Sequence, residues 1–244
     1  MPGPHNIATC QGTHIGRVRR LNEDALFVNE QEMLWLVADG IGGHGNGEKA
    51  SATVVEHVEG YRQSGSIEDC FNDITARLRE ANQACQNTPG KEIQGTTVAA
   101  LLMCQAKAVC VWAGDSRVYR LRGGELTVLT EDHNLAQERY RRGELSLDAA
   151  QRLPAANVLT KAVGIHHDLH LESRVTEVEA GDRFLISTDG LYKELTLEHI
   201  QTALGTPFDE RILTNLIDEA LQRGGKDNIT GIIVDVLENT AGVG

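Results

Sequence analysis

Short apolar runs separated by polar or glycine-containing turns recur along the chain. The clearest runs span residues 33–38, 98–104, 107–113 and 232–237, and they are rich in branched and aromatic side chains. Runs of this length and composition predict buried β-strands. The runs at 98–104 and 107–113 flank a short turn, which indicates neighbouring antiparallel strands. Residues 118–122 and 125–129 flank Gly123-Gly124, a pair typical of a two-residue hairpin.

Helical periodicity occurs between these groups of strands. From residue 67 to residue 85 apolar side chains recur every three or four positions, and Ser66 is placed to cap the helix. Another helix is expected from Glu48, and two more after residue 195, with Thr196 capping the first and Gly224-Gly225 ending the second. The polar segment 132–165 predicts a surface flap with two short helices, followed by a return to the sheet at 158–164.

A glycine-rich segment at 39–47 reads Asp-Gly-Ile-Gly-Gly-His-Gly-Asn-Gly and follows the apolar run at 33–38. Its glycines allow the backbone to approach a ligand closely. It also contains G-x-G-x-x-G, which is typical of dinucleotide-binding units. Those units need a parallel strand directly after the first helix, within about 30 residues. This sequence places a second helix there instead, so the order of elements excludes the dinucleotide interpretation.

The charge balance narrows the choice of partners. Among 244 residues, 35 acids against 23 bases give a formal net charge of −12, which disfavours nucleic acid and anionic membranes as partners. No apolar run approaches the roughly 18 residues of a membrane helix, and residues 1–11 have no signal-peptide pattern. We therefore expect a cytoplasmic protein. Five scattered cysteines without a C-x-x-C pair predict buried, reduced thiols.

Candidate chemistry is concentrated in acidic residues at predicted strand ends. Four such positions, each beside glycine or asparagine, are Asp39, Asp115, Asp189 and Asp227. Each alone suits a turn, but a sheet can bring all four to one edge. Arg19, Glu23 and Asp24 add a guanidinium suited to phosphate and two more carboxylates. Oxygen ligands without His or Cys favour Mg²⁺ or Mn²⁺, and two such ions can deprotonate a bridging water for attack on phosphorus.

Eight short motifs, taken together, resemble the PP2C (PPM) family of bacterial metal-dependent Ser/Thr protein phosphatases. In chain order they are Arg19-x-x-Asn-Glu-Asp24, Asp39-Gly-Ile-Gly-Gly-His-Gly, Gly95-Thr-Thr, Gly114-Asp-Ser-Arg, Asp132-His, Val158-Leu-Thr-Lys-Ala-Val-Gly, Ser187-Thr-Asp-Gly-Leu and Asp227-Asn-Ile-Thr. The resemblance covers nearly the whole chain. It implies an α+β fold, a β-sandwich of two antiparallel sheets flanked by helices on both sides. Residues 1–244 would form one such domain, with the flap at about 132–165.

The resemblance also implies roles for individual residues. Two tightly bound Mn²⁺ or Mg²⁺ ions are expected, bridged by Asp39. The other ligands implied are the carbonyl of Gly40 and the carboxylates of Asp189 and Asp227, with Glu23 and Asp24 acting directly or through water. Arg19 would hold the substrate phosphate, His44 would protonate the leaving oxygen, and Asp115 would help bind a third, weaker ion. The unusual pair Tyr192-Lys193 is expected at the rim, away from the metal ligands.

The implied function is the hydrolysis of phosphoserine and phosphothreonine in proteins, opposing a bacterial Ser/Thr kinase. One alternative is a catalytically silent phosphoprotein-binding module, which would be expected to lack a metal carboxylate, and none is missing here. Another is a partner-switch phosphatase, which would be expected to carry sensor domains. The sequence also resembles free-standing phosphatases that counter the threonine kinase of type VI secretion. A monomer acting on phosphoproteins, without nucleic acid or membrane, is expected.

Overall fold

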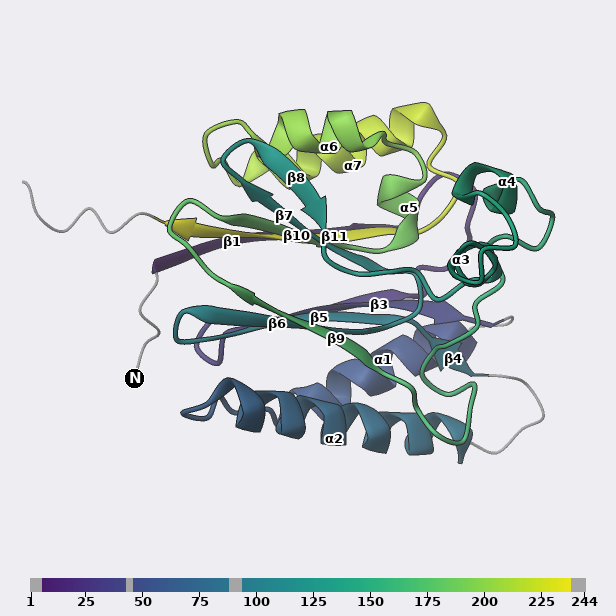
Figure 1. Cartoon of the computed structure of the whole chain (residues 1–244), viewed down its shortest axis with the longest axis horizontal. Helices are drawn as coiled ribbons and strands as arrows, with labels where there is room; N and C mark the ends of the chain where they lie inside the picture. Colours follow the sequence, from purple (N-terminus) through teal and green to yellow (C-terminus); the bar gives the residue numbers. More distant parts are fainter. Residues whose placement is uncertain (1–5, 43–45, 88–93, 238–244) are drawn as a thin grey trace, which may run out of the picture.

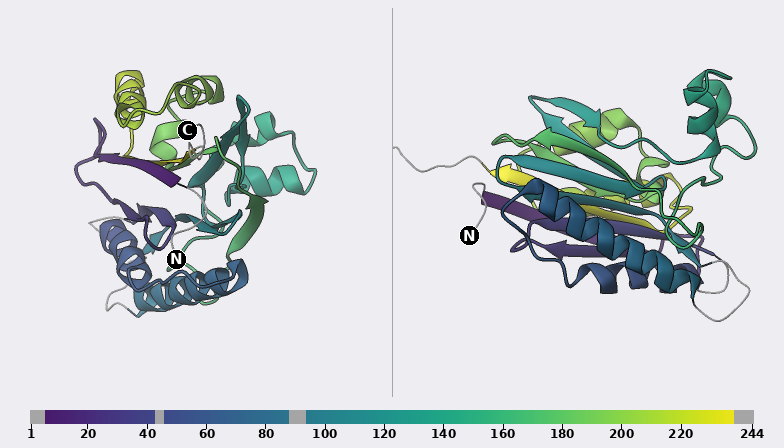
Figure 2. Two further views of the ribbon diagram at one scale, coloured as in Figure 1. Left: turned by 90° about the vertical axis from the view of Figure 1, so that its left-hand side faces the viewer. Right: turned by 60° about the horizontal axis from the view of Figure 1, so that its bottom comes forward.

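Two antiparallel sheets lie face to face between two pairs of helices (Figure 1). The structure is a computed structural model that describes residues 6–42, 46–87 and 94–237. The predicted α+β sandwich is confirmed, because every pairing between neighbouring strands of the two sheets is antiparallel. The two views of Figure 2 show the same layering from other directions.

The first sheet joins the two ends of the described chain. Its strands, in spatial order, are β1 (Asn6–His14), β11 (Ile229–Leu237), β10 (Arg183–Ser187), β7 (Arg117–Arg122) and β8 (Glu125–Val128). β1 and β11 pair along their whole length, from Asn6 opposite Leu237 to His14 opposite Ile229. The last strand therefore lies inside the sheet, between the first strand and β10.

The second sheet contains the first residues of the glycine-rich segment, Asp39 to Ile41, at the end of β3. Its strands, in spatial order, are β2 (Asp24–Asn29), β3 (Leu34–Ile41), β5 (Val98–Cys104), β6 (Lys107–Ala113) and β9 (Glu172–Glu177), and the short β4 (Gly95–Thr96) pairs with the end of β3. Trp35 and Val37 of β3 face the other sheet, whereas Leu34 and Leu36 face the outer helices. Burial on both faces explains why β3 and β5 read as continuous apolar runs.

The helices cover the outer face of each sheet. α1 (Asn46–Val58) and α2 (Ile67–Gln86) lie over the second sheet, and α6 (Leu197–Leu204) and α7 (Arg211–Arg223) lie over the first. The predicted caps are confirmed: the side chain of Ser66 accepts from Asp69, and that of Thr196 from His199. α7 ends at Gly224, as expected. Each helix pair thus seals one outer core by burying its apolar stripe.

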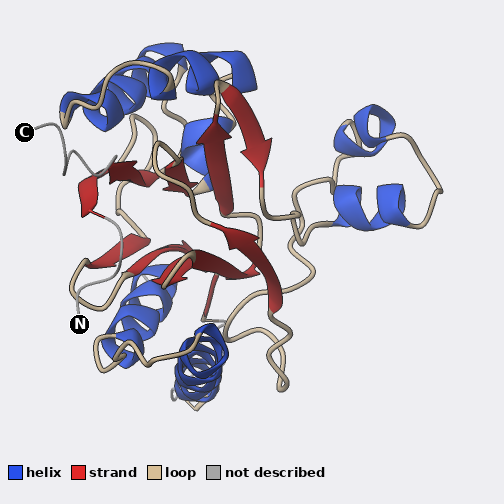
Figure 3. Ribbon diagram, turned by 60° about the vertical axis from the view of Figure 1, so that its left-hand side comes forward, coloured by secondary structure: helices blue, strands red, loops and turns tan. Residues whose placement is uncertain are grey.

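The flap projects from one end of the sandwich. It contains α3 (Leu135–Arg141) and α4 (Leu147–Gln151), which stand away from the sheets in Figure 3. The short helix α5 (Asp189–Tyr192) lies at the same end of the molecule (Figure 1). The flap therefore lies at the same end of the sandwich as Asp189, the predicted site residue with which α5 begins.

Three details of the sequence prediction need correction. The segment 158–164 does not return to the sheet as a strand; it makes only isolated bridges, from Leu159 to Asn134 and from Val163 to Thr96. β3 runs on to Ile41, so Asp39 lies two residues before the strand ends. The prediction also lacked β1 and β9. All five cysteines are buried and free, as expected.

Candidate metal and phosphate site

Carboxylates from five separate segments meet in one pocket of about 300 Å³. The charged side chains that line it are Arg19, Glu23, Asp39, Asp115, Asp189, Lys193 and Asp227. Asp39 belongs to β3 and Asp115 follows β6, both in the second sheet, whereas Asp189 follows β10 and Asp227 precedes β11 in the first. The pocket therefore lies where the two sheets meet at the flap end, as the strand-end pattern predicted.

The register of β2 and β3 places two carboxylates side by side. Asp24 lies directly opposite Asp39 in this antiparallel pair, and opposite residues of a pair project to the same face of a sheet. Thr97 fixes the backbone of Asp39 twice: its hydroxyl accepts from Asp39 N at 3.0 Å, and its N–H donates to Asp39 O at 2.8 Å. Asp39 is therefore held on rigid backbone rather than on a loop.

Hydrogen bonds across the two sheets hold the remaining acids. The Thr188 hydroxyl donates to Asp24 Oδ2 at 2.9 Å and accepts from Thr230 N at 3.0 Å. The side-chain oxygen of Asn228 accepts from Glu23 N at 2.8 Å. Strands β10 and β11 thus position acidic residues that belong to β2 and the segment before it. These contacts hold the Asp24 carboxylate and the Glu23 backbone against the first sheet.

Two glycines allow the backbone segments of the site to touch. A Cβ on Gly40 would lie 2.3 Å from the carbonyl oxygen of Gly47 and 2.6 Å from that of Glu23. A Cβ on Gly190 would lie 2.0 Å from the carbonyl oxygen of Asn228. Any larger residue would push these segments apart. The Asp-Gly pairs are therefore explained by close approach of backbone to backbone.

Burial and mutual repulsion disfavour the charged forms of the crowded acids. Burial, together with Asp24, Asp189 and other nearby carboxylates, raises the pKa of Asp39 well above its ordinary value. Burial, and then the neighbouring Asp189, raise the pKa of Asp24 to about 7 although Thr188 and Thr230 lower it. Burial and Asp189 likewise raise the pKa of Asp115 to about 7. Such a site gains stability from any bound cation.

Unsatisfied oxygen atoms show that the donor set fits hard cations. Glu23 Oε1, Asp24 Oδ1 and Asp189 Oδ1 are buried without a hydrogen-bond partner among the described residues. Buried oxygens of this kind normally find a partner, and carboxylates are the ligands that Mg²⁺ and Mn²⁺ prefer. Among the described residues, however, no group of three or more Asp, Glu, His or Cys side chains is arranged so that it could hold a metal ion. Water molecules or the Gly40 carbonyl would have to complete the ligand set of an ion bound by these acids.

Two cationic side chains lie among the acids. Arg19 Nη2 lies 2.7 Å from Asp227 Oδ2, and half of the Arg19 side chain remains exposed. This hydrogen bond raises the pKa of Arg19 and keeps its guanidinium at the pocket mouth. Lys193 pairs with Asp189 Oδ2, and its Nζ lies 3.7 Å from Asp115 Oδ2. The expectation that Lys193 stays away from the candidate ligands is therefore wrong, because it follows Asp189 by one helical turn.

Comparison with known proteins agrees with this geometry. Residues 11–230 match the family described as protein phosphatase 2C. The chain belongs to the protein phosphatase 2C family. It is 34% identical over 230 residues to the Ser/Thr protein phosphatase PstP of Mycobacterium tuberculosis, covering 91% of this chain and 44% of PstP. It is 31% identical over 237 residues to the Ser/Thr phosphatase Stp of Listeria monocytogenes, covering 91% and 93% of the two chains.

Solved structures of protein phosphatase 2C members have the same fold. PppA, described as a key regulatory component of T6SS in Pseudomonas aeruginosa, is 32% identical, with a TM-score of 0.85 and coverage of 95% and 98%. The catalytic domain of PstP, solved in complex with two manganese ions, is 31% identical, with a TM-score of 0.85 and coverage of 95% and 99%. The chain spans less than half the length of the curated PstP sequence.

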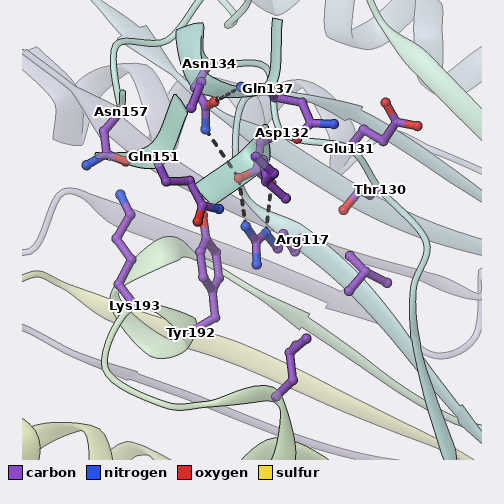
Figure 4. A pocket seen from close by; sticks show the side chains of 14 residues that line it. Arg117, Thr130, Glu131, Asp132, Asn134, Gln137, Gln151, Asn157, Tyr192 and Lys193 are labelled. Atoms are coloured by element: carbon purple, nitrogen blue, oxygen red, sulfur yellow. Dashed lines mark hydrogen bonds and ion pairs between the residues drawn. The ribbon is translucent and has the colours of Figure 1, made fainter. Parts of the chain in front are cut away.

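A larger cavity, of about 530 Å³, separates the flap of this phosphatase 2C chain from the first sheet (Figure 4). It lies beside the carboxylate pocket, and Asn157 and Lys193 line both. Glu23 and Asp189, two of the three acids with unsatisfied oxygens, line the smaller pocket and not the larger one, so the smaller pocket is the candidate metal site. In Figure 4 the guanidinium of Arg117 lies over Tyr192 and is held by Asp132 through two bonds of 2.8 Å.

An ionic cluster fastens the flap to β9. Glu172 Oε1 lies 2.7 Å from Lys161 Nζ, 3.4 Å from Arg141 Nη1 and 3.2 Å from His133 Nε2. Burial alone would raise the pKa of Glu172, but Lys161, His133 and Arg141 lower it to about 2. Burial and Lys161 lower the pKa of His133 to about 4, so this imidazole is neutral at pH 7. Residues before, within and after the flap helices thus converge on one carboxylate.

Several residues of the site were not predicted as functional. Thr97 and Asn228 bind the backbone of Asp39 and Glu23, and Thr188 binds the Asp24 carboxylate, yet no role was predicted for these three residues. Each of them lies inside one of the motifs quoted above, which is the signal that could have found them. His44 lies outside the described residues, so its predicted role stays a prediction. The structure brings the other predicted residues together: Arg19, Glu23, Asp39, Gly40, Asp115, Asp189 and Asp227 line the pocket, and Asp24 lies opposite Asp39.

Proposed function

We propose that the chain is a metal-dependent protein phosphatase that hydrolyses phosphoserine and phosphothreonine in proteins. The observation that carries the proposal is the set of buried, partly unsatisfied carboxylate oxygens next to the exposed guanidinium of Arg19. Acids and a cation in one open pocket suit divalent ions and a phosphate together. The membership of the phosphatase 2C family supports the same activity.

We propose that Asp39 is shared between two Mn²⁺ or Mg²⁺ ions. Asp189, Asp227 and the Gly40 carbonyl complete the ligand set, and Glu23 and Asp24 act directly or through water. Held by these residues, the ions would supply a water molecule that is deprotonated at neutral pH and would neutralise negative charge on the phosphate. Manganese in the related PstP catalytic domain supports this choice of metal.

The protein's own groups then bind and orient the phosphoprotein. Arg19 binds the phosphate oxygens from the pocket mouth, where Asp227 aligns its guanidinium. Thr97 and Asn228 hold the backbone of Asp39 and Glu23, so the acids do not move apart when charge develops on the substrate. His44 remains the candidate for proton donation to the leaving serine or threonine oxygen.

A third, weaker ion was expected at Asp115. Asp115 and Asp189 are the acids nearest to such an ion, and Lys193 already contacts both. The ion would therefore share these carboxylates with an ammonium group. This competition makes any third site weaker than the other two.

We also propose a cellular setting. Similarity to PppA, a regulatory component of T6SS, supports a role in type VI secretion, where the chain would oppose a Ser/Thr kinase. Among residues 6–42, 46–87 and 94–237, none of the helices combines the length and apolar character of a membrane span. The five buried free thiols support a reducing compartment such as the cytoplasm. We propose that residues 1–244 act as one monomeric phosphatase domain with phosphoproteins and a cognate kinase as partners.

Purified protein tests the activity. It should hydrolyse p-nitrophenyl phosphate and a phosphothreonine peptide when Mn²⁺ or Mg²⁺ is present, and EDTA should abolish both reactions. Restoring Mn²⁺ after EDTA should restore turnover, which separates metal removal from denaturation. Full activity in EDTA would exclude the metal mechanism.

A further inference from the structure

Lys193 is built into the acidic site rather than attached to its rim. It directly follows α5, whose first residue is Asp189, so a spacing of four residues brings its ammonium onto Asp189 Oδ2. The same Nζ lies 3.7 Å from Asp115 Oδ2. Lys193 therefore contacts one acid from each sheet: Asp189 follows β10, and Asp115 follows β6.

The residue before Lys193 anchors the end of α5 to Asp115. The hydroxyl of Tyr192 donates to the carbonyl oxygen of Asp115 at 2.8 Å. The guanidinium of Arg117 lies 3.8 Å from the centre of the Tyr192 ring, and Asp132 holds Arg117 through two hydrogen bonds. Figure 4 shows Tyr192 and Lys193 side by side at the edge of the flap cavity. Both residues of this unusual pair are thus directed at Asp115.

The two carboxylate oxygens of Asp189 have different surroundings. Oδ2 pairs with the ammonium of Lys193, whereas Oδ1 is buried without a hydrogen-bond partner among the described residues. Oδ1 remains available for one of the paired ions. Lys193 thereby orients Asp189 for that ion and at the same time occupies the side that faces Asp115.

We propose that the ammonium of Lys193 is the resident cation of the Asp115–Asp189 pair, and that a third divalent ion binds there only by displacing it. The inference rests on the proposed two-ion function. A lysine ammonium is a compact point charge on a flexible stem. A divalent ion bound to the same two carboxylates would be repelled strongly by this ammonium, because the site is half-buried. The side chain is 37% exposed, so it can swing out when an ion enters. The chain thus keeps one positive charge beside the substrate site without a third ion.

Manganese titration of the whole chain tests this, with calorimetry for the tight sites and the electron paramagnetic resonance signal of free Mn²⁺ for the weak one. Wild type should show two tight sites and a third with far lower affinity. Lys193→Met and Lys193→Gln should leave the tight sites in place and strengthen the third at least tenfold, on the order of 1.4 kcal/mol. Lys193→Arg, which keeps the charge, should behave like wild type.

Two further variants identify the site and control for net charge. Adding Asp115→Asn to Lys193→Met should remove the strengthened third site again. Lys226→Met deletes an exposed charge beside Asp227 and should not strengthen a third site, because Lys226 does not belong to the Asp115–Asp189 pair.

The outcomes separate the two proposals. Tight sites in wild type with an unchanged third affinity in both neutral variants would overturn the role of Lys193 and leave the phosphatase proposal standing. Equal strengthening in Lys226→Met would also overturn it, since the effect would then come from net charge alone. Absence of tight sites in wild type, with turnover insensitive to EDTA, would overturn both.

Discussion

Asp24 and Asp39 lie directly opposite each other in the β2–β3 pair, and Asp39 lines the acidic pocket. Two buried carboxylates placed this way disfavour each other's ionisation, and burial raises the pKa of both. A strand register that would destabilise an ordinary protein is therefore kept where cations can neutralise it.

The metal-free protein should be less stable at neutral than at mildly acidic pH. Asp24, Asp39 and Asp115 have folded pKa values above their unfolded values near 4, so between about pH 4 and about pH 7 the folded state binds more protons. Stability falls with rising pH wherever that holds. His133, with its pKa lowered to about 4, acts in the opposite direction, but it is a single group.

Thermal unfolding after EDTA treatment checks this. The midpoint should be lower at about pH 7.5 than at about pH 5.5, and added Mn²⁺ should raise it most at the higher pH. Calorimetry in buffers of different ionisation enthalpy should show protons released on Mn²⁺ binding. A metal-free midpoint that rises steadily over this range would show that the acids ionise freely.

Asp39→Asn and Asp189→Asn should each lose most of the turnover. Each change removes a carboxylate charge from the proposed ligand set. Loss of a residue that only supports a metal ligand lowers metal affinity or activity about 10–100-fold, so loss of a ligand should lower turnover at least on the order of 100-fold. Turnover at saturating Mn²⁺ and calorimetric affinity measure the effect. Asp209→Asn, at an exposed ion pair with Arg211, is the matched control and should retain activity. Near wild-type turnover in either site variant would reject the ligand assignment.

Arg19→Ala should raise KM more than it lowers kcat. The half-exposed guanidinium lines the pocket, where by our proposal it would contact the substrate phosphate in the ground state. Steady-state kinetics on a phosphothreonine peptide at fixed Mn²⁺ separates the two constants. Arg19→Lys should recover only part of the loss, because an ammonium cannot contact two phosphate oxygens with a planar fork. A large fall in kcat at constant KM would place Arg19 in transition-state stabilisation instead.

Glu172→Gln should loosen the flap. The change removes the charge shared by Lys161, Arg141 and His133, and loss of charged hydrogen bonds of this kind costs about 1–3 kcal/mol. Limited proteolysis should cut faster within 134–157, and the thermal midpoint should fall. Glu144→Gln, at an exposed ion pair inside the flap, provides the control. Equal cutting of both variants would mean that Glu172 does not fasten the flap.

Local patterns in the sequence were sufficient to predict most strands of the second sheet and the two helices that cover it. β3 and β5 are buried on both faces and read as apolar runs, and α2 carries its cap and stripe within its own residues. β1 was not predicted because its residues are mixed in polarity and its partner, β11, lies at the other end of the chain. β9 is an edge strand with mostly exposed side chains, so it shows no apolar run.

The candidate acids could be predicted because each stands in a short Gly- or Asn-flanked motif. Their supporting contacts could not, since Thr188 reaches Asp24 and Asn228 reaches Glu23 across sheets that meet only in the folded state. Lys193 was misplaced for a related reason. Its distance from Asp189 is local, but its approach to Asp115 depends on how β6 and β10 lie in opposite sheets.

The position of β11 between β1 and β10 also affects biosynthesis. The neighbour of β1 in the sheet begins at Ile229 and is made more than two hundred residues after β1. During that interval β1 is an unpaired edge that could join other chains. Asp227 is made just before β11, so the acidic pocket cannot form until these residues follow. We expect nascent chains that stop before Asp227 to have no tight Mn²⁺ site and no hydrolytic activity.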